Sequence, residues 1–579
     1  MLKRLSKCIG EYKKSTVLTP IFVSMEVVVE CLLPFITASL IEQIEAGCDL
    51  SVILKYGAAL VVLAMLSLSF GVLAGKHCAI ASCGFAKNLR KDLYENTQNF
   101  SFENIDKFST SSLVTRLTTD VTNVQQSFMM LIRTAIRCPF MLIFALVMSF
   151  VMGGKMALIF VAVVPFLIFA LGMIIKTVMP IFERAFRKYD VLNNSVQENV
   201  KGMRVVKSFV REGYEEQKFD KASEDLAGDF LKAEKVLALS SPVMQLCMYA
   251  VTFCICYFGS KTILFGTNTG FGIGGLSGLI TYGVQILSSL MMISMIFVTL
   301  TMSGESARRI YEVLEEKPTI KDPENAVAEV KNGDVDFDGV YFKYSERAEK
   351  YALENINLHI KSGQTVGIIG GTGSAKSTLI QLISRLYDAT KGSVKVGDVD
   401  VRSYNLEALR NQVSVVLQKN ILFSGTIKEN LRWGDENASD EELVRACKLA
   451  QADEFISSLP NGYDTYIEQG GTNVSGGQKQ RLCIARAILK KPKILILDDS
   501  TSAVDTKTDA LIRNALHNEI PDTTKIIIAQ RISSVENADM IVVLDDGKIC
   551  DLGTHSELLE SSPIYREVYT SQTKGGKME

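Results

Sequence analysis

The stretch TVGIIGGTGSAKSTLIQLI, residues 365–383, decides the fold of the C-terminal half of this chain. It begins as an apolar strand, continues as a loop of small residues, and ends with the apolar spacing of an amphipathic helix. A strand, a Gly-rich loop and a helix in this order are the context that a phosphate-binding loop requires. Backbone N–H groups of residues 371–376 can surround phosphate oxygens, Lys376 can reach the β- and γ-phosphates, and the Ser377 hydroxyl can bind Mg²⁺. The stretch therefore predicts an α/β P-loop nucleotide-binding domain.

Three later segments add chemistry to this loop. KILILDDS, residues 493–500, is an apolar strand that ends in two carboxylates. Asp498 can hold Mg²⁺, and the next residue, Asp499, can orient the attacking water. Gln418 follows another apolar strand in VVLQKN. NVSGGQKQR, residues 473–481, opens a helix, where a hydroxyl, close backbone approach and the helix dipole together make an anion site.

The N-terminal half has a different composition. The chain has 579 residues, a net charge of -2 and a mean hydropathy of +0.18. Up to about residue 305 it carries long, nearly uncharged runs, and each is about 20 residues long, enough to cross the hydrocarbon core of a membrane. We expect six spans, near residues 17–41, 53–75, 131–152, 156–177, 241–263 and 278–300. The fold class is thus a membrane all-α six-helix transmembrane domain plus an α/β P-loop nucleotide-binding domain.

The basic residues set the expected orientation. They concentrate in the N-terminus and in residues 76–130 and 178–240. By the positive-inside rule these segments, and both termini, are expected on the cytoplasmic side. The two long segments have regular apolar positions, so we expect helices that continue beyond the membrane, each pair joined by a short crosswise helix. The predicted domains are a transmembrane domain at 1–308, a linker at 309–334 and a nucleotide-binding domain at 335–573.

Three ionisable residues lie inside the predicted spans. Glu26 and Glu30 are four residues apart on one face of the first span, and Arg137 lies in the third. Charges in a span are costly and tend to face a cavity or a partner, so these residues are candidates for a substrate cavity. The alternative is a place near the interface, where Arg can extend its head group to water. The twelve cysteines have no metal-ligand spacing and no disulfide framework.

SGGQ, about a hundred residues after the phosphate loop, resembles the signature of the ATP-binding cassette (ABC) family. The resemblance covers essentially the whole chain, and the six spans with long extensions resemble the exporter branch. It implies ATP and Mg²⁺ as cofactors, a head-to-tail dimer, and coupling helices around 101–109 and 203–211. It implies adenine stacking by Tyr344 and a metal site at Ser377, Gln418 and Asp498. The residues implied in phosphate binding are Gly370, Gly371, Thr372, Gly373, Ser374, Ala375, Lys376, Ser377 and Thr378.

The chain departs from the family pattern at three positions. Ala375 replaces a Gly, Asp499 replaces the catalytic Glu, and Gln530 replaces the switch His. Asp is shorter than Glu by about 1.5 Å, and Gln cannot accept and return a proton as imidazole does. We therefore expect ATP binding with poor hydrolysis at this chain's own loop. The signature is intact and would serve the partner's ATP through Ser475, Gly476, Gly477 and Gln478.

The sequence thus predicts ATP-driven export of amphipathic small molecules, lipids or peptides across a bacterial cytoplasmic membrane. The expected partner is a homologous half-transporter with the Glu and His that this chain lacks; membrane lipid and the transported molecule are also partners, and nucleic acid is not. A homodimeric exporter, a lipid flippase and an ATP-gated regulatory membrane protein stay open as alternatives. The fusion of both domains argues against an importer, and the six spans argue against a DNA-repair relative of the fold.

Overall fold

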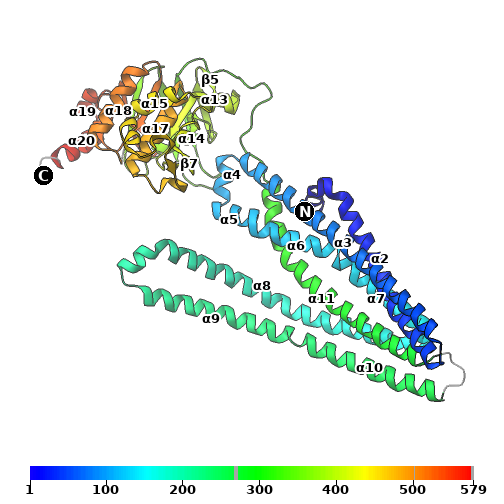
Figure 1. The fold of residues 1–579 in the computed structure, drawn as a ribbon. Coiled ribbons are helices and arrows are strands. Elements are labelled where there is room, and N and C mark those ends of the chain that lie inside the picture. Colours follow the sequence, from blue (N-terminus) through cyan, green and yellow to red (C-terminus); the bar gives the residue numbers. More distant parts are fainter. Residues whose placement is uncertain (266–270, 501–502, 576–579) are drawn as a thin grey trace. The chain divides into compact units, whose positions relative to one another are not determined.

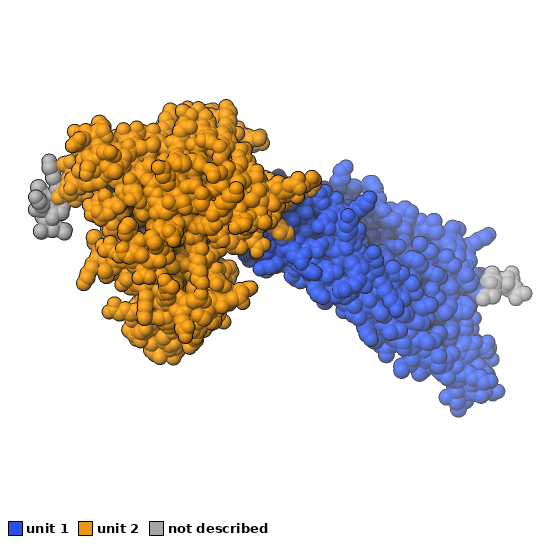
Figure 2. Space-filling view, turned by 90° about the horizontal axis from the view of Figure 1, so that it is seen from above, with its two compact units in different colours: residues 1–98, 109–316 blue, residues 99–108, 317–579 orange. Residues whose placement is uncertain are grey.

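The computed structural model of the chain describes residues 1–265, 271–500 and 503–575. The chain divides into two compact units, coloured separately in Figure 2. Unit 1 comprises residues 1–98 and 109–316, and unit 2 comprises residues 99–108 and 317–579. Residues 99–108 lie within the predicted transmembrane domain in sequence, but they pack with unit 2.

Unit 1 is built of long helices (Figure 1). Within the described residues, five helical stretches are long and apolar enough to cross a membrane, and one of them, Thr110–Ser208, contains both α7 and α8. The six predicted spans therefore fall on α2, α3, α7, α8, α10 and α11. The elements of unit 1 are α1 (Leu2–Leu5), η1 (Ser6–Tyr12), α2 (Lys13–Glu45), α3 (Leu50–Gln98), α5 (Thr110–Thr115), the π-helix η2 (Arg116–Asp120), α6 (Val121–Ile132), α7 (Thr134–Gly153), η3 (Gly154–Ala157), α8 (Leu158–Ser208), α9 (Glu212–Leu237), α10 (Ser240–Phe265) and α11 (Ile273–Glu315).

The third predicted span, 131–152, is wrong as one continuous helix. The chain breaks between α6 and α7 at Arg133, whose φ and ψ of -111° and -67° interrupt the helix. At the other end, α7 stops at Gly154, which has a φ of +49° that suits glycine. Helix α7 itself has 20 residues, about 30 Å at 1.5 Å per residue, which equals one hydrocarbon core.

The predicted extensions beyond the spans are present as helices. α3 has 49 residues and α8 has 51. The first extension is followed by a short separate helix, α4 (Phe102–Lys107). The predicted crosswise helix at 203–211 is wrong, because α8 continues to Ser208 and α9 begins at Glu212. Met203, Arg204 and Lys207 favour continuation of α8 through this segment, and a turn at Val210, with a φ of +51°, reverses the chain.

Close backbone approach and buried polar contacts hold the helices of unit 1 together. A Cβ at Gly274 would lie 2.1 Å from the Ala38 carbonyl oxygen, so α11 and α2 touch where only glycine fits. The Asp120 side chain, fully buried, accepts hydrogen bonds of 2.8 Å from Arg309 Nε and from Ser306 Oγ. Small residues and satisfied polar groups are what helix packing in an apolar solvent needs.

Unit 2 contains a six-stranded sheet, and one edge of this sheet positions the candidate site. The six-stranded sheet has the order β12-β11-β3-β10-β9-β6, with β12 antiparallel at its end and the other strands parallel. The second sheet, β2-β1-β4-β5, is antiparallel, and β7 pairs with β8. The strands are β1 (Val335–Phe342), β2 (Leu353–Ile360), β3 (Thr365–Ile369), β4 (Lys391–Val396), β5 (Val399–Asp400), β6 (Val413–Val416), β7 (Gly425–Thr426), β8 (Tyr466–Ile467), β9 (Ile494–Asp498), β10 (Thr524–Ile528), β11 (Met540–Asp545) and β12 (Lys548–Gly553).

The carboxyl ends of β3, β10, β9 and β6 share one edge of this sheet, and in open α/β sheets ligands bind at that edge. All the predicted nucleotide-site residues that follow strands lie there. The helices of unit 2 are α12 (Lys376–Ile383), α13 (Leu406–Gln412), α14 (Ile427–Leu431), α15 (Asp440–Leu449), α16 (Asp453–Ser458), α17 (Gly476–Leu489), α18 (Thr506–Glu519), α19 (His555–Ser561) and α20 (Pro563–Gly575).

Helix α4 is fastened to unit 2 by hydrogen bonds to the segment after residue 316. The Ser101 N–H donates to Asn104 Oδ1 at 3.0 Å, which caps the helix start. Asn104 Nδ2 donates to the Lys317 carbonyl at 3.1 Å, and the Ile320 N–H donates to Ser101 Oγ at 2.9 Å. Ser101 and Asn104 are buried, so these bonds are shielded from water.

Candidate functional site

The loop between β3 and α12 has the shape of a phosphate cradle. A Cβ at Gly370 would lie 2.1 Å from the Leu544 carbonyl oxygen, so the loop starts pressed against β11. A Cβ at Gly371 or Gly373 would meet nothing within 4 Å, so this part of the loop faces open space. Lys376 Nζ donates to the carbonyl oxygens of Gly370 and Gly371 at 2.8 and 2.7 Å. The residues present therefore fit a nucleotide phosphate chain.

Ala375 is strained in this loop. It is the N-cap of α12 and has a φ of +70° and a ψ of +25°, in the left-handed region. An L-residue with a Cβ pays about 1–2 kcal/mol for that conformation. The sequence shows Ala where the family pattern has Gly, but only the backbone angles show that the conformation at this position suits glycine.

Asp498, at the end of β9, lies beside the loop. Its side chain is buried, and burial raises the pKa of its carboxyl; the hydrogen bond from Ser377 lowers it and the nearby charge of Asp499 raises it. Burial lowers the pKa of the Lys376 ammonium, while Asp498 and Asp499 raise it. A carboxylate, a hydroxyl and a lysine are thus gathered at one point, as a magnesium–phosphate site requires.

Asp499 and Gln530 are in direct contact. Gln530 Nε2 donates a hydrogen bond of 2.8 Å to Asp499 Oδ2. Asp499 has a φ of +48°, and its N–H donates to the Ile528 carbonyl oxygen at 3.0 Å. Strands β9 and β10 are neighbours, so the register brings together two residues that are 31 positions apart.

The signature segment has a structural role in addition to any ligand role. Ser475 caps α17: its Oγ accepts from the Gln478 N–H at 3.3 Å, and its N–H donates to Gln478 Oε1 at 2.9 Å. A Cβ at Gly477 would lie 2.9 Å from the Ala503 carbonyl oxygen, so only glycine fits without a shift. The Ala503 N–H also donates to Gln480 Oε1 at 3.0 Å. The family's D-loop would lie at 500–505; Thr501 and Ser502 of it are outside the described residues.

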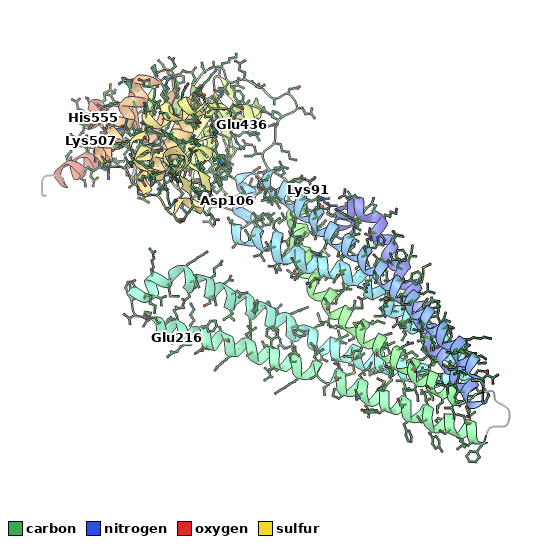
Figure 3. The ribbon with its side chains drawn as sticks, in the orientation of Figure 1. Lys91, Asp106, Glu216, Glu436, Lys507 and His555 are labelled. Carbon is green, nitrogen blue, oxygen red and sulfur yellow. The ribbon has the colours of Figure 1, made fainter. Side chains whose placement is uncertain are left out.

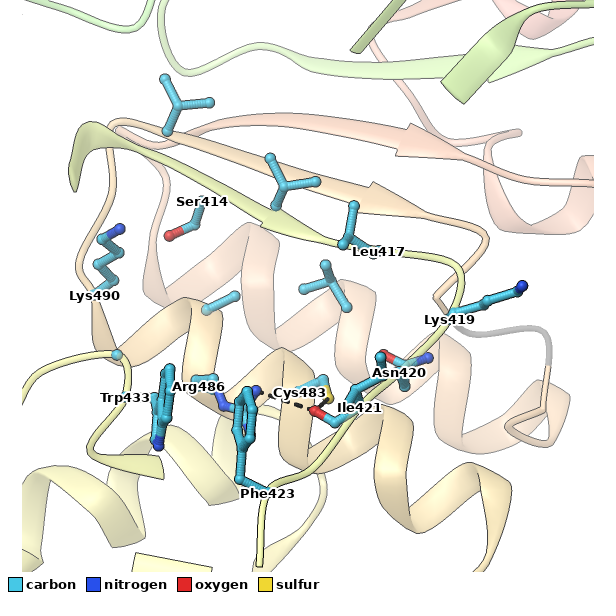
Figure 4. A pocket seen from close by; sticks show the side chains of 15 residues that line it. Ser414, Leu417, Lys419, Asn420, Ile421, Phe423, Trp433, Cys483, Arg486 and Lys490 are labelled. Atoms are coloured by element: carbon cyan, nitrogen blue, oxygen red, sulfur yellow. Dashed lines mark hydrogen bonds between the residues drawn. The ribbon is translucent and has the colours of Figure 1, made fainter. Parts of the chain in front are cut away.

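Gln418 lies two residues beyond β6 and is exposed. Its side chain makes no hydrogen bond with the part of the chain that the structure describes. Beside it is a groove of about 330 Å³, shown in Figure 4. The Phe423 and Trp433 rings stack at 4.1 Å on its wall, and Arg486 lies behind them. The groove is lined by Val413, Ser414, Val415, Val416, Leu417, Lys419, Asn420, Ile421, Phe423, Trp433, Gly434, Cys483, Arg486, Ala487 and Lys490.

Comparison with known proteins agrees with both units. A family model described as "ABC transporter transmembrane region" matches residues 17–290, and one described as "ABC transporter" matches residues 353–502. An "Uncharacterized ABC transporter ATP-binding protein YfiB" from Bacillus subtilis (strain 168) is 37% identical, over 94% of this chain and 94% of that protein. The chain belongs to the ABC transporter family. It is therefore a multi-pass membrane protein with an ABC domain, which implies ATP binding and hydrolysis coupled to transport.

Other ABC proteins resemble the chain over most of its length. An "ATP-dependent lipid A-core flippase" from Desulfotalea psychrophila is 34% identical, over 84% of this chain and 84% of that protein. The solved "Structure of a bacterial Atm1-family ABC exporter with ATP bound" has a TM-score of 0.83 at 24% identity and covers 97% of this chain and 99% of that one. The chain thus has the fold of an ABC exporter, which confirms the predicted fold class.

In this ABC domain, Tyr344 belongs to an aromatic cluster that reaches α4. Its hydroxyl is hydrogen bonded to Thr378 Oγ1 at 2.8 Å, and burial raises its pKa. Its ring meets the Tyr387 ring edge-on at 5.3 Å. The Tyr387 hydroxyl donates to Asp106 Oδ2 at 2.6 Å, and Phe102 packs edge-on against its ring; Figure 3 marks Asp106 on α4. The aromatic residue expected at adenine is thus connected through Tyr387 to α4, which lies in the first segment expected to act in coupling.

The last helix of the ABC domain holds the loop after β10. Gln572 Nε2 on α20 donates to the Gln530 carbonyl oxygen at 2.8 Å, and Gln572 Oε1 accepts from the Ile532 N–H at 2.9 Å. One amide therefore fixes the backbone at and just after the position where the family carries its switch His.

In the membrane unit, the three predicted ionisable residues are brought together. Arg137 Nη1 donates to Glu26 Oε1 at 2.8 Å, and Arg137 Nη2 donates to Glu30 Oε2 at 2.7 Å. Glu26 is 8% exposed. Glu30 and Arg137 also line a cavity, whereas Glu26 lies behind them.

Sequence reasoning missed several residues of these sites. Arg133, one helical turn before Arg137, could have been noticed by its i, i+4 spacing. Trp433 is the only tryptophan of the chain, but its stacking partner cannot be read from spacing. The contact of Tyr387 with Asp106 and that of Gln572 with the loop after β10 join residues 281 and 42 positions apart, and no local pattern signals them.

Proposed function

We propose that the chain is one half of a heterodimeric ABC exporter in a bacterial cytoplasmic membrane, with both termini in the cytoplasm. The observation that carries this proposal is the contrast between two parts of unit 2. The signature is complete and caps the start of α17, whereas the pair Asp499 and Gln530 replaces the family's catalytic Glu and switch His. A partner with the consensus pair would supply the site that hydrolyses ATP efficiently.

The residues that would hold ATP and Mg²⁺ at this chain's own loop are present. The N–H groups of 371–376 and Lys376 would bind the phosphates, Ser377 and Asp498 would bind the metal, and Mg²⁺ would neutralise charge on the phosphates. Gln418 would add a contact to the metal, and Tyr344 would stack on adenine. Binding of ATP is therefore expected to survive the three departures.

Hydrolysis at the same loop is expected to be poor. The Gln530 amide occupies one oxygen of Asp499, and that carboxylate already reaches about 1.5 Å less far than Glu would. A misplacement of about 1 Å can cost about a hundredfold in rate. Gln530 cannot exchange a proton with the attacking water, because an amide does not titrate in this range.

The signature would act on the partner's ATP. At the start of α17, Ser475 and the following N–H groups form the positive end of a 14-residue helix. Such an end stabilises charge that develops on a phosphoryl group. In the head-to-tail dimer of the family this end would face the γ-phosphate held by the other subunit.

A second contact with the partner would form at the groove beside Phe423 and Trp433. The α8–α9 turn presents Phe209 and Val210, which are 74% and 81% exposed. Apolar side chains at the tip of a long helical hairpin are costly in water and suit an aromatic groove. We propose that the turn of one subunit enters the groove of the other, so that closure of the ABC domains moves the helices.

The proposed cargo is an amphipathic small molecule, lipid or peptide. A lipid flippase is the second candidate, and two curated relatives that carry that name, from Desulfotalea psychrophila and Syntrophus aciditrophicus, are 34% and 32% identical to this chain. A homodimer and an ATP-gated regulator are the remaining alternatives.

The test is purification of the chain alone and together with the half-transporter encoded beside it. We expect a stable complex, weak ATPase activity of the chain alone, and ATP-dependent transport by the complex in vesicles. Turnover of the isolated chain at the level of the complex would contradict the degenerate-site proposal. A complex that hydrolyses ATP but moves no amphipathic probe in inverted vesicles would favour the regulator.

A further inference from the structure

Unit 1 contains a cavity of about 540 Å³ between four of its helices. This volume lies within the range of about 300–1,000 Å³ that is typical of sites for drug-sized ligands. Its wall is formed by Glu30 on α2, by Met129 and Met130 on α6, by Arg133 at the α6–α7 break, by Thr134, Arg137, Cys138 and Met141 on α7, and by Val284, Gln285, Ser288, Ser289 and Met292 on α11.

The two arginines on this wall differ in their partners. The Arg137 guanidinium is held by Glu26 and Glu30, at 2.8 and 2.7 Å. Two carboxylates on one arginine leave this group with a net negative charge, and its geometry is fixed from two sides. The charge of Arg137 is therefore already balanced by carboxylates, although only two of its five N–H donors are engaged.

Arg133 has no such partner. In residues 1–265, 271–500 and 503–575 no carboxylate is paired with its guanidinium, and its side chain makes no hydrogen bond. It lies where α3 comes close, since a Cβ at Gly75 would be 3.7 Å from Arg133 Nη1. The 20 residues of α7 place it about one hydrocarbon thickness from the turn at Gly154. An arginine at the end of a span can extend its head group to water or to an anionic ligand at the interface.

Most of the rest of the wall is apolar and adaptable, and Thr134 and Gln285 add polar groups to it. Met129, Met130, Met141 and Met292 supply flexible thioether side chains, which adjust to ligands of varied shape. The Ser288 and Ser289 hydroxyls donate back to carbonyl oxygens of their own helix, at 2.7 Å each, and so offer few polar contacts. One free cation beside a methionine surface matches a molecule with a charged head and an apolar tail.

We propose that this cavity binds an amphipathic anion, with its phosphate or carboxylate head on Arg133 and its tail against the methionines. The inference rests on the proposed export function, because it names the class of molecule that the exporter moves. The head group can belong to a membrane lipid or to a free amphiphile, since both present the same anion to Arg133.

Among the residues that the structure describes, Arg133 is the charged group on this wall without a carboxylate partner, and its charge favours an anion over the other classes. A cationic head would meet Arg133 without a counter-charge and would have to compete with Arg137 for Glu30. A neutral head would leave the Arg133 guanidinium without a partner. An anionic head pairs with Arg133 directly, and a guanidinium–phosphate contact is among the strong hydrogen bonds in proteins.

The experiment measures equilibrium binding to the full chain, with its partner subunit, in phosphatidylcholine nanodiscs without ATP. Radiolabelled dodecyl phosphate is the probe, and dodecyltrimethylammonium and dodecyl maltoside are competitors with the same tail. We expect dodecyl phosphate to bind at least about tenfold more tightly than either competitor, and Arg133→Gln to weaken it by about tenfold, as the loss of one charge-assisted contact implies.

Two control variants separate charge at this position from charge in general. Arg133→Lys keeps the cation and should retain most of the affinity. Lys155→Gln removes an exposed cation at the opposite end of α7 and should change nothing. Equal or tighter binding of the ammonium probe would overturn the proposal, as would unchanged affinity in Arg133→Gln. The comparison of the three head groups on the unaltered protein keeps the test decisive even if Arg133→Gln does not fold.

Discs that contain phosphatidylglycerol distinguish the two sources of the head group. Competition by that lipid assigns the site to membrane lipid, and undiminished probe binding assigns it to a free amphiphile; both results support an anion site. Because binding is measured without ATP, the outcome is separate from export. If dodecyl phosphate binds in an Arg133-dependent manner but is not transported in vesicles, the export proposal alone is refuted. If a cationic probe is transported but dodecyl phosphate does not bind at Arg133, this inference alone is refuted.

Discussion

Gln530 Nε2 donates a hydrogen bond of 2.8 Å to Asp499 Oδ2 across the neighbouring ends of β10 and β9. The two departures from the family pattern are therefore one interaction, in which an amide that cannot titrate restrains a carboxylate that is already short. Variants at these positions should be analysed as a pair, since residues in contact do not contribute additively.

Asp499→Glu combined with Gln530→His should raise the ATPase activity of the assembled dimer by about tenfold to a hundredfold, the range expected for a corrected misplacement near 1 Å. The longer carboxylate regains its reach, and the imidazole can exchange a proton. Steady-state phosphate release measures the effect. Each single variant should give much less than the pair, and an unchanged rate in the double variant would show that Ala375 or the partner's signature limits this site.

Ser475→Arg should abolish turnover of the dimer, because a large cation at the start of α17 prevents closure over the partner's ATP. Lys376→Ala should leave a measurable fraction, because in the proposed heterodimer Lys376 would contact only the ATP of the weaker site. Both variants are to be measured in the same complex of this chain with its proposed partner, with nucleotide binding determined separately. Greater damage from Lys376→Ala would mean that this chain's own loop carries the main hydrolysis.

Ala375→Gly should stabilise unit 2 by about 0.5–1 kcal/mol, because relief of about 1–2 kcal/mol of left-handed strain exceeds the roughly 0.5–1 kcal/mol entropic cost of glycine. ATP affinity should stay equal or increase. Thermal unfolding followed by fluorescence of Trp433 reports on this unit. Ala446→Gly, inside α15, is the matched control and should destabilise by about 1 kcal/mol; the same sign for both variants would contradict the strain assigned to Ala375.

Tyr387→Phe should weaken the attachment of α4 by about 1 kcal/mol, the usual net value of one hydrogen bond. Stimulation of the ATPase by transported substrate should fall, while the unstimulated rate changes little, because the variant touches the contact with Asp106 and not the phosphate loop. Tyr404→Phe removes a comparable buried bond, to the Val396 carbonyl oxygen at 2.8 Å, far from α4 in sequence. If both variants lose stimulation equally, the Asp106 contact has no special part in coupling.

In the background of the Asp499→Glu, Gln530→His double variant, Gln572→Ala should reduce the gained ATPase activity several-fold. The loop that carries residue 530 then loses two hydrogen bonds, and a displacement of a catalytic group by about 1 Å lowers the rate strongly. Thr570→Ala, two residues earlier on α20, removes only a bond within the helix and serves as the control. Unchanged kcat with Gln572→Ala in that background would show that the loop keeps its position without α20.

Much of this protein was determined by local sequence. The apolar runs specify helices because any span must satisfy its backbone hydrogen bonds internally, and the segment 365–383 specifies strand, loop and helix because only Gly-rich backbone can approach phosphates. The same local logic failed at residue 133, where a helix expected to be continuous is broken, and at 203–211, where α8 continues to Ser208 and no separate helix forms.

Only the tertiary structure decided what the departures do. The three departures, Ala375, Asp499 and Gln530, can be identified from the sequence. The register of β9 and β10 brings Gln530 into contact with Asp499, and the backbone angles of Ala375 show a conformation that suits glycine. Likewise Glu26, Glu30 and Arg137 are visible as charges in apolar runs, yet which arginine they bind, and that Arg133 is left facing a cavity, depends on how α2, α3, α6 and α7 pack. The reason is physical: periodicity fixes which face of a helix is apolar, whereas a charge is paired or free according to neighbours that are distant in the chain.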